Sequence, residues 1–108
     1  MISRRHALAA LAATLLAAPG LARAETAKPM PVVASFSILG DFVKEVGGDR
    51  VALTTIVGAN GDSHVYQPTP ADAKKLAAAK VIFVNGLGFE GWMDRLAKAS
   101  GTKAEIIV

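Results

Sequence analysis

The chain has 108 residues, no cysteine and a formal net charge of +3, and 52% of its residues are hydrophobic. This length allows one domain, and this composition excludes a disordered or collagen-like chain. The lack of cysteine excludes a disulfide scaffold, thiolate metal ligands and a thiol nucleophile. Because an N-terminal lipid anchor is attached to a cysteine, we also expect a protein that is not lipid-anchored.

Residues 1–24 are predicted to be an export signal peptide. They begin with a positive segment that contains Arg4 and Arg5, followed by an apolar run of mostly Ala and Leu at 7–18. Residues 22–24 then fit the small-x-small pattern of a cleavage site. The apolar run is shorter than the roughly 20 residues of a membrane span, which disfavours an N-terminal membrane anchor. The paired arginines partly match a twin-arginine motif, so the export route stays open.

The three arginines of this leader carry the whole net charge, because residues 25–108 hold nine basic and nine acidic side chains. Nucleic-acid binding needs a basic patch on the folded body, so we expect no nucleic acid among the partners. The mature chain is expected to begin at Glu25 and to work in the periplasm as a monomer.

The mature chain is predicted to alternate strands with helices after a polar lead-in at 25–30. Apolar and β-branched runs indicate the strands, and helical spacing of apolar residues or runs of Ala indicate the helices. The expected elements are a strand at 32–36, a helix at 38–46, a strand at 51–57, a helix at 70–79, a strand at 81–84, a helix at 90–100 and a strand from 105. This order predicts an α/β fold with a parallel β-sheet, right-handed crossovers and helices on both faces.

Two strands carry further information about the fold. The run at 81–84 is apolar without alternation, which is typical of a central parallel strand covered on both faces. The last strand ends the sequence on Ile-Ile-Val with no polar closure. We therefore expect residues 31–108 to be a truncated part of a larger α/β lobe, with an uncovered region of sheet.

Several residues are predicted to begin or end the helices. Ser37 and Thr69 are candidate N-caps, and Thr69 is followed by Pro70 at the first helical position. Asp72 stands where the acid of a capping box would stand. Stop signals for the first and third helices are Gly47, Gly48 and Gly101.

Ligands bind at the carboxyl ends of the strands in an open parallel sheet, and three predicted loops leave those ends. The longest of them, 58–68, is rich in glycine and holds His64, the only histidine after the leader. Neutral imidazole is a common ligand of divalent metals, so His64 is the candidate metal ligand. Asp62 is placed to orient its ring and Tyr66 to pack beside it. A surface histidine without function is the alternative, because one ligand makes no site and zinc normally takes four.

A second motif follows the third predicted strand. Gly86, Gly88 and Gly91 spell G-x-G-x-x-G between a strand and a helix, which is the setting of a dinucleotide fingerprint. Glu90 argues against it, because a pyrophosphate needs the positive end of the helix there. An exported nucleotide-dependent oxidoreductase is the resulting alternative, and a tight turn is the simpler interpretation. The sequence holds no nucleophile elbow and no Walker A motif, so we expect no catalytic residues and no catalytic cofactor.

Three stretches of the sequence carry a family resemblance: VVASFSILGD at 32–41, GDSHVYQPTPAD at 61–72 and NGLGFEGW at 85–92. They resemble the N-terminal lobe of the zinc- and manganese-binding solute receptors of bacterial ABC transporters. The pattern His-x-Tyr-x-Pro-x-Pro-x-Asp in the second stretch is the most specific of these features. The likeness covers residues 31–108.

The resemblance implies one lobe of a two-lobed receptor that captures Zn²⁺ or Mn²⁺ between its lobes and delivers it to the membrane permease of an ABC transporter. It makes His64 the first metal ligand and places the family's other ligands beyond this sequence, so this chain alone should hold no complete site. It also makes the three glycines turn residues and Trp92 a packing residue. The family includes proteins labelled adhesins, so a surface adhesin is a further alternative.

Overall fold

The computed structural model describes residues 27–108, so the predicted export signal at 1–24 lies outside the described residues. The strands are β1 (Met30–Phe36), β2 (Val51–Val57), β3 (Val81–Phe83) and β4 (Glu105–Ile107). The helices are α1 (Ser37–Gly47), α2 (Pro70–Ala78) and α3 (Met93–Ser100), with a short 3-10 helix, η1 (Gly48–Arg50), before β2. Every strand and helix that the sequence predicts is present.

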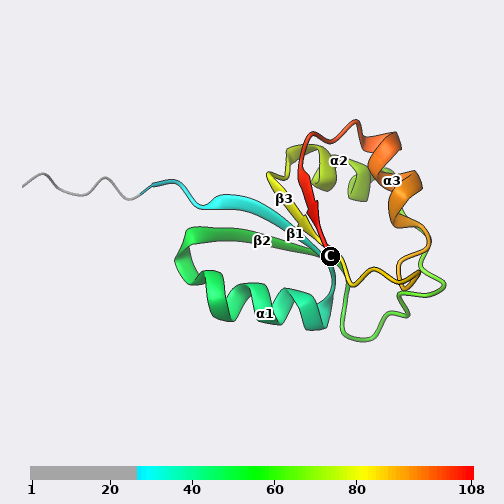
Figure 1. The fold of residues 1–108 in the computed structure, drawn as a ribbon, viewed down its shortest axis with the longest axis horizontal. Coiled ribbons are helices and arrows are strands. Elements are labelled where there is room, and N and C mark those ends of the chain that lie inside the picture. The colour runs from blue at the N-terminus through cyan, green and yellow to red at the C-terminus, as the bar shows by residue number, and fades with distance from the viewer. Residues whose placement is uncertain (1–26) are drawn as a thin grey trace, which may run out of the picture.

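The four strands form one parallel sheet in the order β2-β1-β3-β4. β1 lies beside β2 with Met30 opposite Val51, and beside β3 with Val32 opposite Val81. A right-handed crossover from β1 to β2 places α1 on one face, and the crossovers that run the other way place α2 and α3 on the opposite face. Figure 1 shows α1 on one side of the strands and α2 with α3 on the other. The predicted parallel α/β fold with helices on both faces is confirmed.

The main hydrophobic core lies between the sheet and the α2–α3 layer. Val33 of β1 and Ile82 of β3 are neighbours in the register, and both are almost fully buried. Leu76 of α2 and Leu96 of α3 pack into the same cluster from the helical side. Burial of these aliphatic side chains fixes α2 and α3 on the sheet, since each buried side chain of this kind contributes roughly 1.5–3 kcal/mol.

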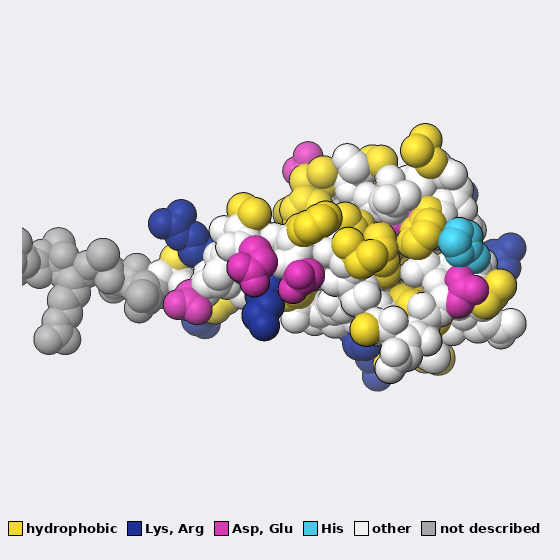
Figure 2. All heavy atoms as spheres, turned by 90° about the horizontal axis from the view of Figure 1, so that it is seen from below, with side chains coloured by type: hydrophobic (Ala, Val, Ile, Leu, Met, Phe, Trp, Pro, Cys, Tyr) yellow, Lys and Arg dark blue, Asp and Glu magenta, His cyan; other side chains and the backbone are white. Residues whose placement is uncertain are grey.

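The opposite face of the sheet is only partly covered. α1 contacts β1 and β2, and an apolar groove stays open between α1 and β3, lined among others by Met30, Leu39 and Phe83. Phe42 and Val46 of α1 are 62% and 90% exposed. Figure 2, which views the molecule from the α1 side, shows hydrophobic side chains gathered on this face. The prediction that the third strand is covered on both faces is therefore wrong for the described residues, while the prediction of an uncovered region of sheet is confirmed.

Two helix starts differ from the prediction. α1 begins at Ser37 itself, with Phe36 at the N-cap and no side-chain cap, because β1 leads directly into the helix. α3 begins at Met93 instead of 90, and residues 89–92 form turns with a hydrogen bond from the Met93 amide to the Glu90 carbonyl (3.0 Å). The side chain of Glu90 is turned inward and is buried.

Within 27–108, no helix combines the length and the apolar character that crossing a membrane requires.

The other predicted helix ends are confirmed. Thr69 and Asp72 form a reciprocal capping box around the first turn of α2, with Pro70 at the start of the helix. α1 ends before Gly48 (φ +51°), and α3 ends before Gly101 (φ +64°). Both glycines have a positive φ that other residues adopt with strain, which explains why the helices stop there.

Candidate metal-binding edge

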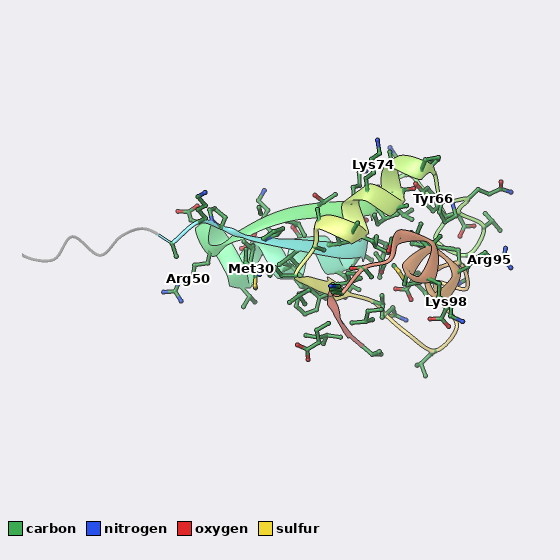
Figure 3. The ribbon with its side chains drawn as sticks, turned by 90° about the horizontal axis from the view of Figure 1, so that it is seen from above. Met30, Arg50, Tyr66, Lys74, Arg95 and Lys98 are labelled. Atoms are coloured by element: carbon green, nitrogen blue, oxygen red, sulfur yellow. The ribbon has the colours of Figure 1, made fainter. Side chains whose placement is uncertain are left out.

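Two connections leave the carboxyl ends of β2 and β3 at the same edge of the sheet. The first, 58–69, carries His64, whose side chain is 66% exposed. The second, 84–92, carries the three glycines of the G-x-G-x-x-G motif. Figure 3 shows Tyr66 of the first connection at the opposite end of the described residues from Met30 and Arg50. The structure thus brings the predicted metal-ligand loop to the position where open parallel sheets bind ligands.

The imidazole of His64 is held by Asp62, as the sequence predicts. The Oδ1 atom of Asp62 accepts a hydrogen bond from the backbone N–H of His64 (2.9 Å) and lies 3.1 Å from Nδ1 of the ring. These contacts, the backbone one first, hold the pKa of Asp62 below its usual range. A carboxylate on Nδ1 favours the tautomer with its proton there, which leaves the Nε2 lone pair available to a metal ion.

A phenylalanine supports the other side of the imidazole. The ring of Phe89 meets the ring of His64 edge to face, with centroids 4.7 Å apart, and stacks at a tilt against Phe36 at 4.8 Å. Sequence reasoning missed Phe89 because it lies in the next connection, with all of α2 and β3 in between. The ring of Tyr66, which the sequence places beside His64, packs against the ring of Trp92, with centroids 5.3 Å apart.

Tyr66 and Asp72 close the base of the His64 loop. The Tyr66 hydroxyl donates to Oδ2 of Asp72 (2.6 Å), and the backbone N–H of Thr69 donates to the same oxygen (2.9 Å). Burial opposes ionisation of Asp72, but these hydrogen bonds and the nearby Lys75 outweigh it and lower the pKa of Asp72. The hydrogen bond from its hydroxyl to Asp72 raises the pKa of Tyr66 to about 12. The loop is therefore fixed at its end by a buried, ionised carboxylate.

Trp92 fixes the loop close to His64. Its indole N–H donates to the backbone carbonyl of Ser63 (2.7 Å), and Ser63 is 6% exposed. The Trp92 ring also packs against the hydrophobic core, as the sequence predicts for a packing residue. His64 is consequently an exposed side chain on a backbone that is held from both sides.

The G-x-G-x-x-G connection is already occupied by a carboxylate of the chain. The backbone N–H groups of Asn85 and Gly86 donate to Glu90 (2.6 and 3.0 Å), and Gly86 and Gly88 have positive φ. In a dinucleotide site such amides would bind the pyrophosphate. The glycines therefore form a tight turn, and the nucleotide-binding alternative is not supported.

The described residues do not make a metal site by themselves. No group of three or more His, Asp or Glu side chains in 27–108 lies close enough together to hold a metal ion. His64 supplies one imidazole at an open edge, with Asp62 behind it. This arrangement suits one ligand of a site whose other ligands come from elsewhere.

Several known proteins are similar to this chain. The manganese-binding lipoprotein MntA of Halalkalibacterium halodurans is 40% identical over 74 residues, which cover 68% of this chain and 25% of that protein. The manganese ABC transporter substrate-binding lipoprotein PsaA of Streptococcus pneumoniae is 35% identical over 95 residues, which cover 84% of this chain and 31% of that protein. The chain thus spans about a quarter to a third of the length of these relatives.

A solved structure and a family model agree with these relatives. The Mn-bound periplasmic metal binding protein from Candidatus Liberibacter asiaticus superposes with a TM-score of 0.66 and 40% identity, over 71% of this chain and 29% of that one. The model of the family described as zinc-uptake complex component A, periplasmic (ZnuA), matches residues 32–108. With most of its residues inside that match, the chain belongs to the ZnuA family of periplasmic zinc-uptake components.

Proposed function

We propose that this chain is the N-terminal part of an extracytoplasmic receptor that captures Zn²⁺ or Mn²⁺ and delivers it to the permease of an ABC transporter. The observation that carries the proposal is the setting of His64 in a chain of this family. Its Nδ1 is bound by Asp62, its side chain is 66% exposed, and it lies at the carboxyl edge of a parallel sheet. Binding and release of the ion need no covalent step, so we propose no catalytic activity.

In this proposal His64 supplies one nitrogen ligand through Nε2, and further residues of the protein supply the others. Residues 31–108 form part of the first lobe, and the leader at 1–24 directs export to the periplasm before it is removed. The relatives are named lipoproteins, which goes against the expectation of a protein without a lipid anchor, although this sequence has no cysteine. Membrane attachment is therefore not part of the proposal, and neither the relatives nor the fold favours an adhesin.

The test is a calorimetric titration with Zn²⁺ and with Mn²⁺, carried out on the full-length protein that the gene encodes. The His64→Ala variant should lose affinity for the transported ion by more than about 100-fold, since loss of a ligand exceeds the 10–100-fold cost of losing an outer partner. Gln67→Ala is the matched control, because Gln67 is an exposed residue of the same loop, and it should leave affinity unchanged. Unchanged affinity in His64→Ala would overturn the assignment. Affinity should also fall on acidification, because a protonated imidazole cannot bind a metal.

A further inference from the structure

We propose that Glu90 is the positioning residue of the metal-binding edge: its buried carboxylate holds the turn that places Phe89 against the imidazole of His64. This inference rests on the proposed function, because it gives Glu90 a role in preparing the His64 ligand.

The carboxylate of Glu90 joins three segments of the chain. Its Oε2 atom accepts hydrogen bonds from the Ser35 hydroxyl (2.5 Å) at the end of β1 and from the Asn85 backbone N–H (2.6 Å). Its Oε1 atom accepts one from the Gly86 backbone N–H (3.0 Å). Glu90 is 7% exposed and Ser35 is fully buried. A buried carboxylate is stable only when such donors replace its water, so these bonds fix the side chain in one position.

The carboxylate determines the path of the backbone at 85–89. Gly86, Leu87 and Gly88 all have positive φ, of +76°, +57° and +79°. This conformation is strained for an L-residue such as Leu, so the chain adopts it only where other contacts require it. The two amides at 85 and 86 converge on the carboxylate, as backbone amides do around an anion. The hydrogen bond from the Phe89 amide to the Gly86 carbonyl (3.1 Å) then closes the turn.

Phe89 is the residue that leaves this turn, and it transmits the position of the turn to His64. Its ring lies between Phe36, which follows Ser35 in β1, and the imidazole of His64. Asp62 binds the imidazole at Nδ1 while Phe89 contacts the ring edge to face. The ring is thus supported by its own loop on one side and by the Glu90 turn on the other.

The variant Glu90→Gln tests this role. An amide has one acceptor oxygen instead of two, so at least one of the two backbone N–H groups loses its partner. The first readout is the NMR position of the His64 imidazole C–H resonances in the metal-free, full-length protein that the gene encodes. The second readout is the affinity of that protein for Zn²⁺. The His64→Ala variant assigns these resonances, and Phe89→Leu shows where they move when the ring current of Phe89 is removed.

We expect the His64 resonances of Glu90→Gln to move toward those of Phe89→Leu and Zn²⁺ affinity to fall about 10-fold, the low end for loss of an outer partner. Glu105→Gln is the matched control, since Glu105 is an exposed carboxylate of the same chain, and it should change neither. Ser35→Ala, which removes one of the three donors and keeps the charge, should produce the same change at smaller amplitude, and it serves if Glu90→Gln fails to fold.

The outcomes separate this inference from the proposed function. His64 resonances that stay at their parent positions in folded Glu90→Gln or Ser35→Ala, while Phe89→Leu moves them, would overturn the positioning role. Unchanged metal affinity in His64→Ala would instead overturn the proposed function. In that case the resonances still decide whether Glu90 holds Phe89 against the imidazole.

Discussion

The two connections at the carboxyl edge of the sheet are both organised by a buried carboxylate, yet they present different surfaces. Asp72, 2% exposed, lies at the base of the His64 loop, where it binds the Tyr66 hydroxyl and the amide of Thr69. Glu90, 7% exposed, lies inside its turn and binds the amides of the turn itself. A carboxylate at the base leaves the imidazole of His64 exposed at the tip of the loop, whereas a carboxylate inside the turn fills the place that an external anion would take.

The strongest test of this contrast is removal of the carboxylate at the base. Asp72→Ala loses the capping box of α2 and leaves the Tyr66 hydroxyl without its acceptor, so we expect a loss of about 2 kcal/mol in the free energy of unfolding. Urea unfolding measures it. Asp62→Ala is the control at the exposed tip of the same loop and should change stability far less than Asp72→Ala does. Equal losses in the two variants would show that the loop is not held at its base.

The turn should be less tolerant of a side chain than the loop. In Gly86→Ala the new methyl group meets the side chain of Val108, and φ is +76°, so we expect a loss of about 1–2 kcal/mol in urea unfolding. Gly58→Ala in the His64 loop is the control, because a methyl group there meets no atom within 4 Å and φ is not in the positive range. That variant should be neutral or slightly more stable. A neutral Gly86→Ala would mean that the turn is free to rearrange.

The hydrogen bond between Tyr66 and Asp72 should make the free energy of unfolding depend on pH both in alkali and in acid. The pKa of Tyr66 is raised from 10.0 to about 12, so its contribution is complete below pH 10 and is lost as the pH rises through 12. The pKa of Asp72 is lowered from 3.8, so its contribution is present above that pH and is lost as the pH falls further. Tyr66→Phe should abolish the alkaline loss and weaken the acid one. Unfolding midpoints of both proteins across the pH range measure this, and identical alkaline profiles would contradict it.

The smallest expected effect concerns the tip of the turn. Leu87 has a φ of +57°, and its side chain is fully exposed, so burial against the described residues does not offset its backbone strain. Asn adopts this conformation more readily, and Leu87→Asn should raise the free energy of unfolding by up to about 1 kcal/mol. Thermal unfolding detects such a change. Destabilisation in this variant would contradict the backbone strain assigned to Leu87.

The sequence was sufficient for most features that depend on neighbouring residues, although it placed the first N-cap at Ser37, one residue too late. The capping box at Thr69 and Asp72, the stop at Gly48 and the pairing of Asp62 with His64 all join residues a few positions apart. The order of strands and helices also follows from local pattern, because parallel sheets of this kind allow few arrangements. These features explain why the position of the candidate ligand at the sheet edge could be predicted.

The features that sequence reasoning missed depend on contacts between distant segments. Glu90 turns inward, where it accepts a hydrogen bond from the hydroxyl of Ser35, 55 residues earlier, as well as from two nearby backbone amides. The third helix, α3, begins only at Met93. The imidazole of His64 meets Phe89 because two loops converge at one edge. The uncovered face of β3 could not be read from its apolar run, which is the same whether one face or two are packed.

The sheet order has a consequence for how the chain folds. β1 is the first strand to be synthesised, yet it lies inside the sheet, with Val32 opposite Leu53 on one side and opposite Val81 on the other. The first pairing closes a short loop through α1, whereas the second must wait for β3 and closes a much longer loop, and non-local pairings of this kind slow folding. We therefore expect the pairing of β3 with β1 to limit the rate of folding. The His64 loop lies in the chain segment between these two strands, so we expect the candidate metal-binding edge to form late.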